Sequence, residues 1–277
     1  MPKERFITIG SVKDHLTTWL AEKTDAAMAR EAESLPLRQD MVTLLTFVRD
    51  ARVVGTQATG NMPLKAVQEV TARFVNPPKL EETVGDQTFR IRSETDVWAL
   101  YFLHILADVG GLLHAVRLQR WRLTVPGEQF LGLDVRLQIV FLLAVWWYRV
   151  NWIVAYPYAG MGDRLPLLFS RRTLAYLRSL PTRTSIPFEE FANRLIADTG
   201  LTWDAPEQSF AATSLRGAIH RMVIDILDDF GALVCKYRKE SLGQRKVPKL
   251  VAFKITPWGM ALLDALAVVG GGEKTWI

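Results

Sequence analysis

The sequence of 277 residues has a single cysteine, Cys235. One thiol cannot form an internal disulfide, and a chain with so few cysteines is typical of the reducing cytoplasm, where we place this protein. Neither His-x-x-x-His nor Cys-x-x-Cys spacing occurs, and the Gly-x-x-x-x-Gly-Lys and Gly-x-Gly-x-x-Gly loops that hold phosphates are missing. These absences argue against a zinc site and against nucleotide chemistry. We therefore expect no catalytic residues, no cofactor and no metal.

Long apolar runs are also missing. The N-terminus lacks the apolar core of a signal peptide. The most hydrophobic stretch, 139–147, lies between Arg136 and Arg149 and is too short for a spanning helix, which needs about 20 apolar residues. A second run, 97–116, contains His104 and is broken by two glycines. We expect both runs to be helices of the protein core, without membrane contact.

What the sequence does contain indicates a large folded body. Hydrophobic residues make up 49% of it and charged residues 23%, which excludes a disordered chain. A chain of this length can bury roughly 75% of its unfolded surface, and the length predicts about two domains. The net charge of +5 permits an anionic partner without requiring one.

Three groups of residues are candidate chemical sites. His104 lies in an apolar run, where a hydrogen-bonded core histidine is more common than a metal ligand. Asp225, Asp228 and Asp229 fall on consecutive turns of one expected helix; they could bind magnesium, but one helix rarely makes octahedral ligands converge. We read them as a solvated face. Cys235 lies in an expected strand and is read as a small hydrophobic residue.

Four landmarks recur in the same order in the two halves of the chain. They are an amphipathic helix, a helix start with a polar N-cap (Asn61 or Ser185) and a proline, a glycine at a helix end, and a threonine before a last helix. They occupy 45–49, 61–64, 105–113 and 123–131 in the first half and 174–178, 185–188, 226–234 and 255–263 in the second.

The chemistry of these landmarks favours duplication of one structural unit. Gly110 and Gly231 fit a left-handed C-cap, at which a chain turns sharply out of a helix. Thr124 and Thr256 are N-cap residues for the helices that follow. The alternative is two unrelated helical segments that share capping chemistry.

Each copy reads as three helices, two strands and a final helix. The first copy has helices at 40–50, 63–74 and 94–109 and strands at 112–118 and 121–123, with a long loop at 75–93 that carries an extra strand at 88–92. The second copy has helices at 166–180, 187–198 and 214–230 and strands at 233–238 and 249–255.

This order resembles the winged-helix domain, a variant of helix-turn-helix. The Gly-x-Leu helix exits and the Thr-x-x-Gly closures carry the resemblance, which covers most of 40–133 and 165–267. It implies an α+β fold that is mainly α with small β-hairpin wings, built as tandem winged-helix repeats. It also implies that the third helix of a unit reads a nucleic-acid groove.

The remaining segments complete the expected domain organisation. Residues 133–155 read as one long helix that is apolar all round, and such a helix is buried on most sides. We expect both units to pack around it. The expected parts are an N-terminal helical arm (1–38), the first unit (39–133), the central helix and linker (134–164), and the second unit with a basic wing and a flexible tail (165–277). Val12, Leu16, Trp19, Leu20 and Lys23 have helical spacing, so the arm either packs on the first unit or forms a homodimer.

The positive charge is concentrated in the second wing. From Lys236 to Lys254 the net charge is +6, more than that of the whole chain, with Glu240 as the only acid. The first wing is also basic. Two basic hairpins on repeated units favour contact with a phosphate backbone.

We therefore interpret the chain as a non-enzymatic nucleic-acid-binding protein in transcription regulation, with duplex DNA favoured over RNA. The third helix of the second copy offers Arg216 and Arg221, whereas the equivalent helix of the first copy is apolar and reads nothing. The expected binding residues are Arg216, Arg221, Lys236, Arg238, Lys239, Arg245, Lys246 and Lys249 in the second unit and Arg117, Arg120 and Arg122 in the first.

Three alternatives remain open. The charge run can be a solvated hairpin whose lysines protect an exposed edge strand from aggregation. The chain can be a protein-interaction scaffold subunit built from winged-helix units. It can also be a regulator with a small-molecule pocket between the copies, near Trp146 and Trp152.

Overall fold

The computed structural model describes residues 7–84, 87–155, 165–166, 168–205, 207–242 and 245–270, with side chains except at 84, 154, 242 and 245. The expected linker at 156–162 and the expected flexible tail at 271–277 lie outside the described residues. The chain forms two compact units, residues 1–14 with 33–150 and residues 15–32 with 151–277. The expected segment 134–164 is thus divided between the units at residue 150.

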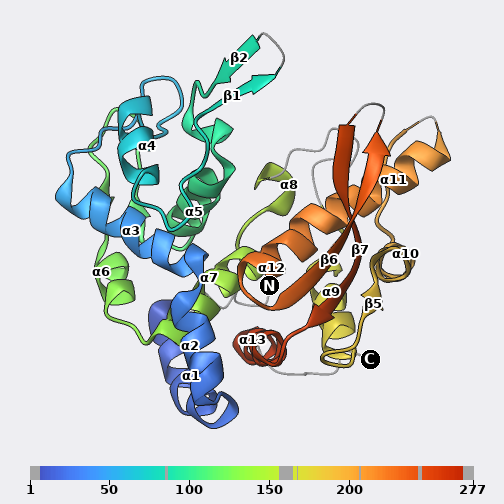
Figure 1. The fold of residues 1–277 in the computed structure, drawn as a ribbon. Helices are drawn as coiled ribbons and strands as arrows, with labels where there is room; N and C mark the ends of the chain where they lie inside the picture. The colour runs from blue at the N-terminus through green and yellow to red at the C-terminus, as the bar shows by residue number, and fades with distance from the viewer. Residues whose placement is uncertain are drawn as a thin grey trace. The chain divides into compact units, whose positions relative to one another are not determined.

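The first unit is mainly helical, with two small antiparallel hairpins (Figure 1). Its core includes the buried face of the third helix and an edge-to-face contact between Phe102 and Trp146, whose ring centroids are 5.3 Å apart. The elements after the N-terminal helices are α3 (Pro36–Asp50), α4 (Leu64–Thr71), β1 (Glu81–Val84), β2 (Gln87–Arg90), η1 (Glu94–Asp96), α5 (Trp98–Val109), β3 (Leu113–His114), β4 (Arg122–Leu123), α6 (Val125–Leu131) and α7 (Val135–Tyr148).

The second unit surrounds a three-stranded antiparallel sheet of order β5-β7-β6. The helix that leads into β6 is continuous from Gln208 to Asp229 and contains one π-helical segment. Its elements are α8 (Trp152–Ala155), α9 (Phe169–Arg178), β5 (Ile186–Pro187), α10 (Phe188–Thr199), α11 (Gln208–Ile219), the π segment η2 (His220–Asp225), α12 (Ile226–Asp229), β6 (Leu233–Leu242), β7 (Arg245–Ile255) and α13 (Pro257–Val269).

The α+β class with small hairpins is therefore confirmed. Among the described residues, none of the helices combines the length and the hydrophobicity that crossing a membrane demands.

The N-terminal segment forms two helices, α1 (Ile9–Lys23) and α2 (Ala26–Ser34), where the spacing predicted one. Asp25 separates them because its carboxylate accepts the N–H of Met28 at 2.8 Å. Val12, Leu16 and Leu20 are buried, so the apolar face predicted for this segment is buried within the chain. A homodimer through this face stays a prediction.

The two helix exits have the same backbone hydrogen bonds. Gly111 and Gly231 both adopt positive φ, +70° and +69°. The N–H of Leu112 donates to the carbonyl of Ala107 at 2.7 Å, and the N–H of Ala232 donates to that of Leu227 at 2.8 Å. The left-handed residue of the first exit is therefore Gly111. Gly110, predicted for this role, is helical with φ −70°.

The final helices of the two halves also begin in the same way. The hydroxyl of Thr124 accepts the N–H of Gly127 at 3.0 Å and donates to the carbonyl of Gly111 at 2.6 Å. The hydroxyl of Thr256 accepts the N–H of Gly259 at 2.7 Å and donates to the carbonyl of Gly231 at 2.9 Å. We call these two arrangements the threonine closures. Both predicted N-caps are confirmed.

The polar caps predicted for the second helices are wrong. In both cases the N-cap is the proline itself, and no side chain caps the helix. Helix α4 begins at Leu64 and α10 at Phe188, because an extended proline already leads the chain into the first turn. Asn61 and Ser185 lie outside both helices.

The prediction of a single long central helix is also wrong. The segment is divided into α7 and α8, because the side chain of Asn151 accepts the N–H of Ile153 at 3.1 Å and starts a new helix. Helix α7 is buried nearly all round, as its composition predicted. The packing of both units around it stays a prediction.

The extra strand predicted at 88–92 exists as β2, which pairs with β1.

Candidate nucleic-acid interface

The longest hairpin of the described chain consists of β6 and β7 (Figure 1), and we call it the distal hairpin. Its pairing runs from Leu233 with Ile255 to Leu242 with Arg245. The strands are longer than predicted, because the pairing continues beyond the part that β5 covers. A β-bulge interrupts the register after Lys236 and leaves Val251 without a partner, which increases the local twist.

The distal hairpin has one face turned toward the helix that precedes it. On this face Leu233 and Phe253 are buried, and the ring of Tyr237 lies 6.2 Å from the ring of His220. Because successive side chains of a strand alternate in direction, Lys236 projects from the opposite face, and it is exposed. The structure therefore does not bring Lys236 together with the predicted residues of the helix.

Near the tip, both faces of the hairpin are free of the core. Arg238, Lys239 and Lys246 are exposed there, and none of them forms an ion pair with a described carboxylate. We call these three residues the tip cations. Arg245 belongs to the same end of the hairpin, but its side chain lies outside the described part of the structure.

Lys249 differs from the other predicted residues. Its Nζ lies 3.3 Å from a carboxylate oxygen of Glu240 and 3.6 Å from one of Glu189, and its side chain is half-buried. Glu189 comes from α10, which the pairing of β5 with β7 places beside the hairpin. Lys249 is thus neutralised within the chain and adds little to the field that a phosphate would meet.

The helix predicted to read a groove starts six residues earlier than expected. Helix α11 begins at Gln208 rather than at Ser214, because 208–213 continue the helix toward its N-terminus. Arg216 therefore lies in the last turn of α11, and Arg221 lies beyond it in the π segment η2. Arg221 is exposed, whereas the guanidinium of Arg216 donates to the side-chain carbonyl of Asn193 at 3.1 Å.

The exposed face of α11 contains a glycine that packing against the described residues does not require. Gly217 is exposed, and a Cβ added there would meet nothing within 4 Å. Glycine costs about 1 kcal/mol relative to alanine inside a helix. Thr213 and Phe210, on the same exposed side, leave this face open to a partner. A glycine in a helical pattern was a signal in the sequence that our interpretation missed.

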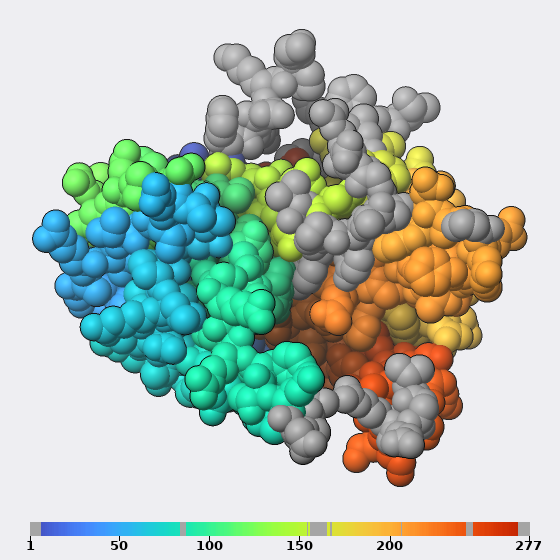
Figure 2. Space-filling view, turned by 90° about the horizontal axis from the view of Figure 1, so that it is seen from above, coloured from blue at the N-terminus to red at the C-terminus, as the bar shows by residue number. Residues whose placement is uncertain are grey.

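The far end of the distal hairpin and the start of α11 lie at the same end of the second unit (Figure 1). The view onto that end shows both the orange helix and the red hairpin at the surface (Figure 2).

A polar cluster lies behind the hairpin, around the π segment. His220 Nε2 is 3.0 Å from Asp225 Oδ1, and the His220 ring is 5.5 Å from the ring of Phe188. Burial, with the nearby charge of Asp228, raises the pKa of the Cys235 thiol to about 12. The thiol therefore stays protonated at neutral pH and is not a nucleophile. Among the residues that the structure describes, no three His, Cys, Asp or Glu side chains are placed to hold a metal ion.

The hairpin of the first unit is much shorter than predicted. Strands β3 and β4 have two residues each, and the chain between them pairs with 54–55 through single bridges to Arg117 and Arg120. Trp121 is fully buried, and its indole N–H donates to the carbonyl of Gly60 at 3.2 Å. This hydrogen bond of the indole holds the chain between β3 and β4 against the unit, so that β3 and β4 cannot extend into long strands. All three predicted arginines, Arg117, Arg120 and Arg122, are exposed.

His104 is a hydrogen-bonded core histidine, as its apolar surroundings predicted. Its Nδ1 lies 2.6 Å from Glu94 Oε1. The other oxygen of the buried Glu94 accepts the N–H of Met62 at 2.6 Å. The His104 ring also lies 4.4 Å from the ring of Trp121, so this network supports the base of the first hairpin.

Comparison with protein-family models, with curated proteins and with solved structures finds no match for this chain.

Proposed function

We propose that this chain is a non-enzymatic, duplex-DNA-binding protein built from two winged-helix units, in which the second unit makes the main contact. The supporting observation is that the tip cations pair with none of the described carboxylates, on a hairpin whose far end lies at the same end of the unit as the start of α11. The repeated threonine closures support the tandem arrangement, because the same hydrogen bonds join helix, hairpin and last helix in both halves.

Contact with a phosphate backbone requires cations that carboxylates of the chain do not neutralise. A cation that pairs with phosphate releases a condensed counterion, so affinity falls with salt. The three tip cations can do this, whereas Lys249, held by two carboxylates, cannot do so without losing its own partners. Direct readout by α11 involves few charged side chains, and we expect modest sequence specificity.

The test is the salt dependence of binding to a 30-base-pair duplex, followed by fluorescence anisotropy between about 50 and 200 mM salt. Replacing Arg238, Lys239 and Lys246 by Gln should reduce the slope of log affinity against log salt by about 2.7, at about 0.9 per phosphate contact. The matched control replaces Lys23, Lys65 and Lys79, which are exposed elsewhere, and leaves the slope unchanged. Equal slopes for the two triple variants would contradict the proposal.

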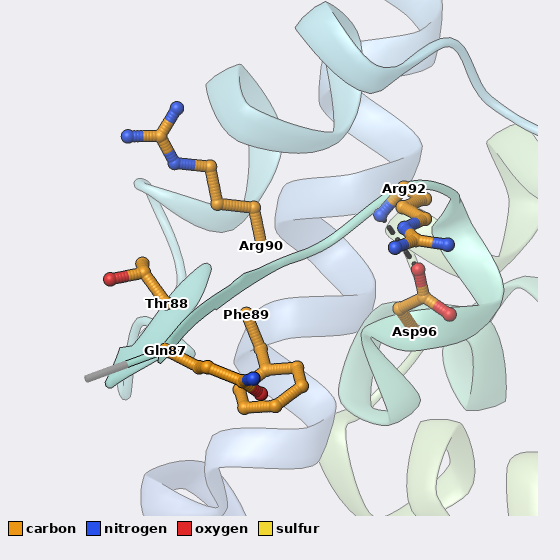
Figure 3. A pocket seen from close by; sticks show the side chains of 6 residues that line it. All are labelled: Gln87, Thr88, Phe89, Arg90, Arg92 and Asp96. Carbon is orange, nitrogen blue, oxygen red and sulfur yellow. Dashed lines mark hydrogen bonds between the residues drawn. The ribbon is translucent and has the colours of Figure 1, made fainter. Parts of the chain in front are cut away.

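A second candidate is a protein-interaction scaffold, and the β1–β2 hairpin favours it. Phe89 is 56% exposed at the edge of an open cavity of about 560 Å³ (Figure 3). The side chains of Phe89 and Gln87 point to one side of β2, and those of Thr88 and Arg90 to the other (Figure 3). Such a hairpin can dock a protein through the exposed ring of Phe89. This function predicts a complex that Phe89→Ser disrupts and no salt-dependent retention of DNA.

A further inference from the structure

The first hairpin presents an apolar side chain to solvent from a strained backbone. Leu118 is 61% exposed and has a φ of +59°. A residue with a Cβ is disfavoured in this left-handed region, which glycine or asparagine adopts much more easily. Strain at an exposed position without a packing benefit is typical of functional sites.

The loop around Leu118 is held rigidly. Its N–H donates to the carbonyl of Gly55 at 3.1 Å, and the N–H of Gly55 donates back to the carbonyl of Gln119 at 3.0 Å. The backbone N–H of the buried Trp121 donates to the carbonyl of Val53 at 2.9 Å. A side chain at Gly55 would collide with the carbonyl of Val116, 2.5 Å from the added Cβ, so this close approach requires glycine. The position of Leu118 is thus fixed before any partner arrives.

The surroundings of Leu118 are cationic. Arg117, Arg120 and Arg122 are all exposed, and none of them pairs with a carboxylate in the part of the chain that the structure describes. An apolar side chain between arginines suits a DNA minor groove, where arginines meet the phosphates and the narrow groove while an apolar wedge enters a base step. An apolar protein surface would leave these charges without partners.

From this geometry we infer that Leu118 is a wedge that inserts between base pairs from the minor groove and kinks the duplex. The inference rests on the proposed DNA binding and adds a second contact, in the first unit. A wedge prefers steps that unstack easily, and pyrimidine–purine steps such as TA are the most flexible. The first unit then selects DNA by its deformability rather than by hydrogen bonds to bases.

The test uses two duplexes of equal length that contain only A·T pairs. One alternates A and T and has a TA step at every second position, whereas the other is a stiff A-tract without such steps. The protein should bind the alternating duplex about tenfold more tightly. With 2-aminopurine in place of one adenine of a TA step, unstacking should raise the fluorescence.

The key variant is Leu118→Asn, because asparagine suits the left-handed backbone. The variant should fold at least as stably as the wild-type protein and should lose the preference for the alternating duplex. It should not raise the fluorescence of 2-aminopurine. Its salt slope should not change, since no charge is removed. The matched control is Val125→Asn, which removes an apolar side chain of even greater exposure, 73%, from ordinary helical backbone. This control should keep the preference.

The outcomes separate the two proposals. If wild-type protein binds both duplexes equally and with normal salt dependence, the wedge is wrong and the proposed function stands. If neither duplex is bound, both proposals fall. If Leu118→Asn leaves DNA binding intact but abolishes binding to a protein partner, the loop is a protein-docking element and the wedge is again wrong.

Discussion

Gly217 gives a prediction in which stability and binding change in opposite directions. The change is Gly217→Ala, which adds one methyl group to the exposed face of α11. Nothing lies within 4 Å of the added Cβ, and the residue has ordinary helical backbone. The folded chain therefore accepts alanine without a clash.

The size of the stability effect follows from helix propensity alone. Alanine is better than glycine by about 0.8–1.0 kcal/mol inside a helix. For a protein of this size, about 1 kcal/mol raises the midpoint of thermal unfolding by roughly 2–4 °C. The position lies close to the π segment, which begins three residues later, so the gain is expected at the lower end of this range.

The binding effect has the opposite sign if a partner approaches this face closely. A methyl group at the point of closest approach should weaken binding of the 30-base-pair duplex about fivefold to tenfold, which corresponds to about 1–1.4 kcal/mol. Thermal unfolding by circular dichroism and anisotropy titration measure the two effects on the same sample. A stabilised variant with unchanged affinity would show that the bare face of α11 does not touch DNA. A destabilised variant would refute the structural premise.

Three further predictions concern the fold. Asp40→Asn should stabilise the protein at pH 7, because burial raises the pKa of this carboxyl and its ionisation therefore costs stability as pH rises through the normal aspartate range. The gain should vanish below that range, where the carboxyl is protonated in both the folded and the unfolded chain. The amide oxygen of the variant can still accept the N–H of Val75. Cys235 should react with iodoacetamide at pH 8 two to three orders of magnitude more slowly in the folded chain than in urea, as mass spectrometry can show; comparable rates would contradict its pKa of about 12. Thr124→Val and Thr256→Val should each lower the free energy of unfolding in urea by about 1–2 kcal/mol, because each variant loses a helix cap and a hydrogen bond to a carbonyl. A clear difference between the two losses would argue against equivalent closures.

The sequence predicted those elements that depend on local chemistry. Glycine at a helix exit and threonine before a last helix act through neighbours in the chain, so the closures could be placed from residue type alone. The one-residue error between Gly110 and Gly111 arose because two adjacent glycines satisfy the same pattern, and only the backbone shows which of them is left-handed.

One of the errors is local, and another depends on residues far apart in the sequence. The break between α7 and α8 depends on the competition between an apolar pattern and the side chain of Asn151. The short first hairpin depends on Trp121 and its bond to Gly60, sixty-one positions away. No periodicity in either segment contains that information.

The candidate site was predicted in its composition but not in its grouping. The sequence identified the basic hairpin correctly, yet it could not show that Glu189 would lie beside Lys249, because this requires the pairing of β5 with β7. Alternation along β6 could have separated Lys236 from the helix side, but only with the register known. Leu118 was missed because a positive φ at leucine has no signature in the sequence.

The threonine closures have a consequence for how such a chain can vary. Each closure joins the base of its hairpin to the end of the preceding helix, because the threonine hydroxyl donates to the carbonyl of the helix-exit glycine. Strands of two residues and of ten or eleven residues grow from the same closure in this one protein. The length of a hairpin can therefore vary while its closure stays the same. A longer or shorter hairpin could be grafted onto either closure without a change in the helices that it joins.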